Sequence, residues 1–271
     1  MIKAFAMSWI LALAACGGSG GNGGDAPAPP ALSAQGLWIG RTSTSSRSVT
    51  GIVLDDGTYW VLYSFPGGSF PGASTLIAGF IQGTGTSLNG GFSSSDGIDF
   101  NPEEQGINGA TVAANYVVKQ SFEGSVTYPN LNQPFTFTSS YNTDYDQTPS
   151  ASAIAGTYAG SASVKGGTEP TTIVVSPGVV VGTGLIAGTG LVVGPGGSIA
   201  NGCNFLGTAV PRAKGNLYDL SVVVSGDGAC SSGPSEVNKG IGYFDASAKR
   251  LYLTALDKSR SDGLIFVGIK P

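Results

Sequence analysis

From Gly36 onward, short runs of alternating apolar and polar residues are separated by glycine-rich turns. Val, Ile, Thr, Ser and Tyr are common in these runs, and long helix-forming runs are absent. This pattern is typical of short antiparallel strands. The sequence therefore predicts an all-β fold of two antiparallel β domains, each a small barrel or sandwich of about six to eight strands. The strands are expected at residues 50–54, 58–63, 112–120, 122–128, 135–139, 171–175, 179–181, 217–225, 240–244, 251–256 and 264–269.

The two predicted domains repeat sequence landmarks in the same order. The landmarks are Gly-x-aromatic-x-Gly at 36–40 and 156–160, a threonine that opens an apolar strand at 50 and 171, Leu-Ile-Ala-Gly at 76–79 and 185–188, and Asn-Gly at 89–90 and 201–202. Several landmarks in one order favour an internal duplication. Chance similarity between two glycine-rich β segments is the alternative. We expect the first β domain at residues 34–148 and the second at 153–271.

A six-residue tandem of glycine and aliphatic residues interrupts the second domain at residues 182–199. Its first copy fits the dinucleotide fingerprint G-x-G-x-x-A, but that motif needs a helix after its last position. More glycine and β-branched residues follow instead. We therefore expect an expanded hairpin or loop, whose role the sequence does not define.

The amino terminus has the layout of an export signal. Lys3 precedes an uncharged run at residues 4–15, which is too short to span a bilayer as a helix. The run ends in Leu13-Ala-Ala-Cys16, which resembles the lipobox of bacterial lipoproteins. The resemblance implies that residues 1–15 are a signal peptide and that Cys16 carries a diacylglycerol and acyl chains such as palmitate. An ordinary cleaved signal with a chance cysteine is the alternative.

The whole chain is similar to uncharacterised envelope lipoproteins of Gram-negative bacteria. Gly17, rather than Asp, follows the cysteine, which by this analogy implies the outer membrane and leaves open the periplasmic or surface face. Residues 16–33, rich in Gly, Ala and Pro, are expected to form the lipidated cysteine and a disordered, flexible linker. Within it, residues 17–21 match G-x-S-x-G, but the strand and helix that this motif requires are missing.

The cysteine count and the charge balance limit which covalent links, metal sites and partners are expected. Without residues 1–15 two cysteines remain, Cys203 and Cys230, and an even pair in an exported chain predicts a disulfide. A zinc site is a poor alternative, because the chain has no His.

Loss of Lys3 leaves 12 basic and 17 acidic residues, so nucleic acid is not expected as a partner.

The sequence contains few combinations of residues that could form a catalytic site. The absence of His excludes Ser-His and Cys-His catalysis, and neither the S-x-x-K pattern nor a P-loop occurs. The densest acidic group is Asp96, Asp99, Glu103 and Glu104, which could hold Ca²⁺ or act as paired carboxylates on a glycosidic bond. We expect a solvated loop there instead. Two further acidic pairs are expected in a connection between the domains (Asp144 and Asp146) and in a hairpin turn (Asp55 and Asp56).

Aromatic residues supply the candidate ligand contacts. Tyr59 and Tyr63 fall on one face of a predicted strand and Trp60 on the other, so an exposed face could stack on sugars or partners. Burial of one face in a core would explain half of them without a ligand. Trp38, in Gly36-x-Trp38, resembles the first-strand tryptophan of lipocalin-like barrels, where the ring closes one end of a ligand cavity.

These observations favour a lipid-anchored, non-catalytic binding or scaffold module that meets the membrane through its acyl chains and an unidentified envelope protein or small ligand. No metal or cofactor is expected. A carrier of a small apolar ligand inside a lipocalin-like barrel is the second hypothesis. A carboxylate-dependent glycan hydrolase is the third hypothesis and is disfavoured, because no acidic pair stands out beside aromatic residues in one segment.

The anchor has a direct test. Replacing Cys16 by Ser removes the thiol that is acylated, so the protein should leave the membrane fraction and take up no labelled fatty acid. Fractionation and metabolic labelling measure both effects. If label still enters the Cys16→Ser protein, the lipobox assignment is wrong.

Overall fold

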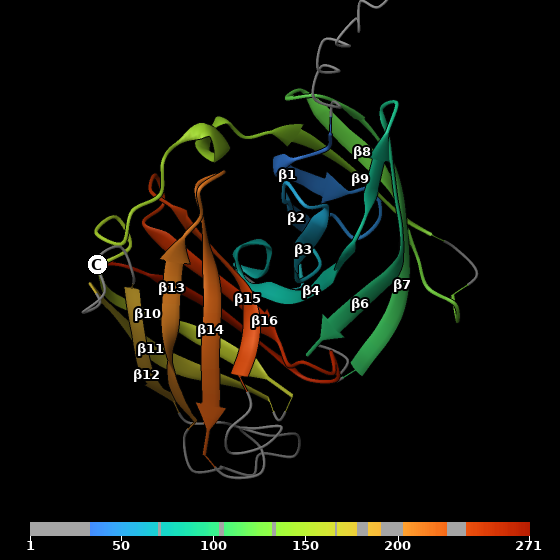
Figure 1. Cartoon of the computed structure of the whole chain (residues 1–271). Helices are drawn as coiled ribbons and strands as arrows, with labels where there is room; N and C mark the ends of the chain where they lie inside the picture. The colour runs from blue at the N-terminus through green and yellow to red at the C-terminus, as the bar shows by residue number, and fades with distance from the viewer. Residues whose placement is uncertain are drawn as a thin grey trace, which may run out of the picture. The chain divides into compact units, whose positions relative to one another are not determined.

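The computed structural model describes residues 33–69, 72–102, 106–131, 134–165, 167–177, 184–190, 203–226 and 237–271, with backbone only for 184–190 (Figure 1). The predicted signal peptide and acylated cysteine lie outside the described residues, as do Glu103, Glu104 and Cys230. In these described ranges the regular structure consists of strands and two short 3-10 helices, which confirms the all-β prediction. Within the described ranges, no helix has the length and apolar character that a membrane crossing requires.

The first β domain is a nine-stranded antiparallel sheet in the order β4-β3-β2-β1-β9-β8-β7-β6-β5. Its elements are β1 (Gly36–Thr42), β2 (Ser48–Val53), β3 (Thr58–Ser64), η1 (Ala73–Thr75), β4 (Ile77–Thr84), β5 (Thr86–Leu88), β6 (Gly91–Asn101), β7 (Gly106–Val117), β8 (Ser121–Thr127), β9 (Phe135–Tyr141) and η2 (Thr143–Asp146). Strand β4 also pairs with β6, so the sheet curls back on itself.

The second β domain is a closed barrel of eight antiparallel strands. They are β10 (Gly156–Val164), β11 (Gly167–Pro177), β12 (Gly184–Gly190), β13 (Asn204–Pro211), β14 (Leu217–Ser225), β15 (Val237–Asp245), β16 (Arg250–Leu256) and β17 (Gly263–Ile269). Strand β10 pairs with both β11 and β17, which closes the ring and leaves no edge. Part of the predicted tandem, residues 184–190, is strand β12; the rest lies outside the described residues.

Both domains begin in the same way. In each, the first strand pairs with the second and with the last. The Trp38 indole N–H donates a 2.9 Å hydrogen bond to the Ala34 carbonyl, and the Tyr158 hydroxyl donates one of the same length to the Ile154 carbonyl. Both rings are fully buried. In both domains the aromatic residue of the repeated landmark thus contacts the chain four residues before it, whereas Leu-Ile-Ala-Gly runs into the fourth strand of the first domain and lies in the third strand of the second, so the internal duplication stays a prediction.

The second glycine of the landmark has a steric cause. A Cβ on Gly40 would collide with the backbone of Thr138 in β9, and a Cβ on Gly160 would collide with that of Val267 in β17. Any side chain at either position would push the last strand away from the first. Glycine therefore allows the closing strand to approach in both domains.

Leu32–Pro271 forms one compact unit, and its described residues form three apolar clusters. One lies inside the curled sheet, a second inside the barrel, and the third, here called the shared cluster, joins outward-facing side chains of both. The shared cluster contains Leu37, Ile52, Leu54, Trp60, Leu62, Phe80, Phe100 and Tyr145 with Leu217, Ile241, Tyr243, Leu256, Ile265 and Val267.

Strand β3 is buried on both faces because of this arrangement. Tyr59 and Tyr63 point into the curled sheet, and Trp60 and Leu62 point into the shared cluster. The predicted alternation of the aromatic side chains is therefore confirmed. Polar contacts border the shared cluster: Arg260 donates to the carbonyls of Gln82 and Asp96 at 2.5 and 2.8 Å.

The acidic segment around Asp96 and Asp99 corrects one expectation. It is not a solvated loop but part of strand β6, where the register shifts between Ser94 and Gly97. The bulge places an extra residue in the strand and interrupts the alternation of polar and apolar positions, which is why the sequence pattern hides the strand. Asp96 accepts hydrogen bonds from the Thr84 amide and the Ser94 hydroxyl, both at 2.9 Å, whereas Asp99 is only 2% exposed.

Glu169 is an acidic side chain inside the barrel. It lies in β11 on the same face as Ile173 and Val175 and has no exposed surface. Among the described residues, neither carboxylate oxygen finds a hydrogen-bond partner at normal length and angle. Burial raises the pKa of Glu169 to about 7, and the backbone N–H of Cys203 offsets part of that rise.

This burial predicts a pH-dependent stability. A raised native pKa favours the protonated form, so stability is highest below the unfolded pKa of 4.5, falls as the pH rises to about 7, and is flat above it. Glu169→Gln should therefore stabilise the protein by up to about 3 kcal/mol at pH 8 and by little at pH 4. Denaturant unfolding at both pH values measures this difference. Glu123→Gln, at an exposed position of β8, is the matched control, and an equal effect of Glu169→Gln at both pH values would contradict the prediction.

Candidate functional site

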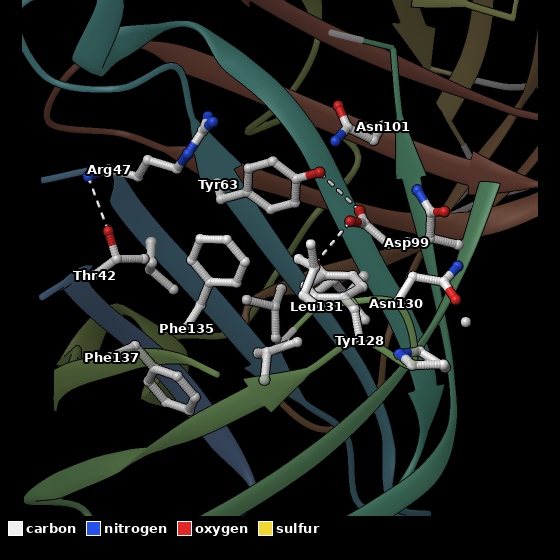
Figure 2. Close-up of a pocket in the computed structure, with 17 residues that line it drawn as sticks. Thr42, Arg47, Tyr63, Asp99, Asn101, Tyr128, Asn130, Leu131, Phe135 and Phe137 are labelled. Atoms are coloured by element: carbon white, nitrogen blue, oxygen red, sulfur yellow. Dashed lines mark hydrogen bonds between the residues drawn. The ribbon is translucent and has the colours of Figure 1, made fainter. Parts of the chain in front are cut away.

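A cavity of about 260 Å³ lies inside the curled sheet of the first domain (Figure 2). It is formed where β1, β3, β6 and β8 end and where β2, β7 and β9 begin. The lining residues are Thr42, Arg47, Val49, Val61, Tyr63, Ile81, Asp99, Asn101, Asn108, Gly109, Val126, Tyr128, Pro129, Asn130, Leu131, Phe135 and Phe137.

Aromatic rings fill the opposite end of the same interior. Strand β1 runs from Trp38 beside these rings to Thr42 at the cavity, and β9 runs the other way from Phe135 to Tyr141. The Trp38 ring lies 5.4 Å, between ring centroids, from both Phe122 and Tyr141. The curled sheet is thus plugged by aromatic side chains at one end and hollow at the other.

The carboxylate of Asp99 is the central polar group of the cavity. Pairing of β4 with β6 puts Asp99 opposite Ile81, on the inner face of the sheet. Tyr63 donates its hydroxyl to Oδ1 at 2.7 Å, and Tyr128 donates its hydroxyl to Oδ2 at 2.8 Å, as Figure 2 shows. A buried carboxylate is costly unless it is hydrogen-bonded, and these two bonds offset that cost.

Arg47 places a positive charge on the same cavity. Its Nη1 donates to the Ser64 carbonyl at 2.7 Å, and its guanidinium carbon lies 5.6 Å from the centroid of the Tyr63 ring. Burial and the neighbouring Asp99 charge raise the pKa of Tyr63 well above its usual value of 10, although Arg47 lowers it in part. Tyr63 therefore keeps its proton at neutral pH and remains the donor to Asp99.

The cavity wall combines apolar and polar surfaces. Val49, Val61, Ile81, Val126 and Phe137 belong to the apolar cluster inside the sheet, and three asparagines also face the space. Among the lining residues that the structure describes, Arg47 and Asp99 carry the only formal charges. The described residues contain no group of three acidic or sulfur side chains placed to hold a metal ion. Apolar walls with a few fixed polar groups are the usual make-up of a small-molecule binding site.

The predicted ligand-contacting residues fall in different places. Tyr63 lines the cavity. Tyr59 and Trp38 are buried in the inner cluster and are not among the lining residues; the Tyr59 hydroxyl donates to Ser94 at 3.1 Å. Cys203 is fully buried in the barrel core, and because Cys230 lies outside the described residues, the Cys203–Cys230 disulfide stays a prediction.

Sequence reasoning missed Arg47 and Tyr128 and misjudged Asp99. Asp99 stands between the apolar residues Ile98 and Phe100, but these three positions follow the bulge and are too few to indicate a strand by themselves. Tyr128 ends the predicted strand at residues 122–128 and Arg47 precedes the predicted strand at 50–54, and nothing in their local pattern marks either residue as part of a site. Both residues come to line one cavity with Asp99 only when the sheet curls.

Comparisons with known proteins leave the chain without an assigned family. No family model and no curated protein matches it. Two solved structures are similar: a "putative outer membrane protein" from Bacteroides fragilis, at 14% identity over 88% of this chain and 98% of that one with a TM-score of 0.24, and a DUF3598-family protein of unknown function from Nostoc punctiforme, at 10% identity over 89% and 97% with a TM-score of 0.30. Similarity at this level carries no argument about function.

The tyrosine contacts of Asp99 can be tested by stability. Tyr63→Phe removes a donor from a buried carboxylate, so it should reduce the free energy of unfolding by about 2 kcal/mol. Tyr59→Phe, a change in the same strand as Tyr63, loses a bond to the neutral hydroxyl of Ser94; it is the matched control and should cost about 1 kcal/mol. Urea unfolding at pH 7 measures both. A loss at Tyr63 no greater than that at Tyr59 would contradict the role given to Asp99.

Proposed function

We propose that this protein is a lipid-anchored, non-catalytic binding module that takes up a small ligand in the cavity of its first β domain. The observation that carries the proposal is the 2% exposed carboxylate of Asp99, held by two tyrosine hydroxyls in the wall of a cavity of about 260 Å³. A folded protein retains such a buried charge at a stability cost, and recognition of a ligand is a use that justifies the cost.

A carrier role is the more specific form of this proposal. The hollow end of the curled sheet has apolar walls, and the other end is plugged by Trp38 and its aromatic neighbours. That division agrees with the resemblance of Gly36-x-Trp38 to the first strand of lipocalin-like barrels. The second domain supplies no comparable support, because apolar side chains from seven of its strands fill the described part of its interior.

The arrangement of carboxyl groups in and around the cavity does not support the hydrolase hypothesis. Glycoside hydrolysis uses two carboxyl groups on either side of the scissile bond. Asp99 is the acidic residue of the described cavity wall, and both of its oxygens accept tyrosine hydroxyls. Asp96 is not among the lining residues; its carboxylate forms an ion pair outside the cavity with the Arg260 guanidinium, at 3.8 Å.

The proposed location follows from the sequence alone. The lipobox at residues 13–16 would attach the chain to a membrane through the acyl chains on Cys16, and the linker that ends at Ser33 would give the β domains reach. Gly17, rather than Asp, follows Cys16, and by analogy with other bacterial lipoproteins we propose the outer membrane as the location. Its partner in this view is the bilayer, together with the ligand of the cavity.

Native mass spectrometry tests the proposal. The Gly17–Pro271 chain, exported through an ordinary cleavable signal and purified without detergent, should carry a reproducible extra mass. Val61→Phe adds bulk inside the cavity and should abolish that mass, while Leu206→Phe, at a 67% exposed position of the barrel, should keep it. A bare mass for the wild-type chain, or an extra mass that survives in Val61→Phe, would refute the proposed site.

A further inference from the structure

We propose that the cavity selects an uncharged ligand whose polar end donates hydrogen bonds, as an alcohol or sugar hydroxyl does, on an apolar body. This inference rests on the proposed function and specifies the chemical class of its ligand. Three features of the cavity carry it: the balance of its two charges, the direction of its hydrogen bonds and the position of its apolar walls.

The two charges argue against a charged ligand. Arg47 and Asp99 line one small cavity with opposite signs. An ammonium group drawn to Asp99 would share the small cavity with the guanidinium, and a carboxylate drawn to Arg47 would share it with Asp99, so each would gain one favourable and one unfavourable Coulomb interaction. A binding site discriminates through such unfavourable pairings as much as through favourable ones. A neutral ligand avoids both penalties.

The direction of the hydrogen bonds requires a donor on the ligand. A tyrosine hydroxyl has one proton and two acceptor sites. Tyr63 and Tyr128 give that proton to Asp99, so any further polar group that meets either phenol oxygen must donate. The raised pKa of Tyr63 keeps this direction fixed at neutral pH. An ether or a tertiary amide, which only accepts, could make no hydrogen bond to these oxygens.

The remaining wall fits an apolar body. Val61, Ile81 and Phe137 face the cavity from three strands of the inner cluster. Leu131, which is 49% exposed, also lines it, so the apolar wall extends to a residue in contact with solvent. A ligand with its hydroxyl toward Asp99 can therefore keep its hydrocarbon part in apolar contact throughout.

Four probes with one hydrocarbon ring separate these features. They are cyclohexylmethanol, its methyl ether, cyclohexylmethylammonium and cyclohexanecarboxylate, measured by saturation-transfer NMR titration against the lipidated full-length protein in lipid nanodiscs. The alcohol should bind at least about tenfold more tightly than each of the other three. Equal or tighter binding of the ether, the ammonium or the carboxylate would overturn the inference.

Charge variants sharpen the test. Arg47→Gln leaves Asp99 as the sole charge, so the ammonium probe should gain about tenfold relative to the alcohol. Asp99→Asn leaves Arg47 alone, so the carboxylate should gain instead. Arg41→Gln, at an exposed position of β1 outside the cavity, is the matched control and should change no preference. Arg47 is only half-buried, so its variant keeps the test decisive even if Asp99→Asn fails to fold. Unchanged preferences in Arg47→Gln would refute the charge argument.

The outcomes distinguish this inference from the proposed function. If a charged probe or the ether binds best and Val61→Phe abolishes its binding, the site stands and only the ligand class is wrong. If no probe binds, the ligand class is rejected, and the native mass measurement decides the proposed function by itself. If binding survives in Val61→Phe, the probes occupy another surface and the inference falls.

Discussion

The structure depends on apolar surface that neither β domain could bury alone. Strands of the curled sheet and of the barrel present outward-facing side chains such as Trp60, Phe80, Ile265 and Val267, and these side chains are buried only in the shared cluster. Sheets that are apolar on both faces need a cover on both faces. Separated from each other, the two domains would each expose a contiguous apolar patch. This constraint explains why β3 and β4 lack the polar alternate positions of a half-exposed strand.

The same cluster sets the position of the cavity. Phe80 of β4 and Phe100 of β6 are opposite each other, pack with ring centroids 5.5 Å apart, and both belong to the shared cluster. Their burial fixes the register in which β4 meets β6. The neighbouring pair, Ile81 and Asp99, must then point to the other side of the sheet, into the cavity. Packing outside the curled sheet therefore places the polar group inside it.

Much of the fold could be predicted from the sequence, but little of the site. Alternating patterns located most strands, including β8 and β9, and the Asp-Gly turn at Gly57 has the positive φ of 85° that such turns require. Strand β6 was missed because its bulge breaks the alternation. The cavity joins Arg47, Asp99 and Tyr128, which lie as far as 81 positions apart and meet only through strand pairing that local patterns do not encode. In a β-sheet protein, the residues that meet in a site depend on which strands pair.

Closure of the sheets also determines how the chain can fold. In the barrel, the first strand pairs with the last, so Val164 and Leu264 become neighbours although one hundred residues separate them. In the curled sheet, Trp38 and Tyr141 are paired across a similar separation. Bringing such distant segments together costs loop entropy before any contact repays it, and proteins dominated by non-local pairing fold slowly. Until the closing strand arrives, the first strand of each domain remains an unpaired edge open to pairing with another chain.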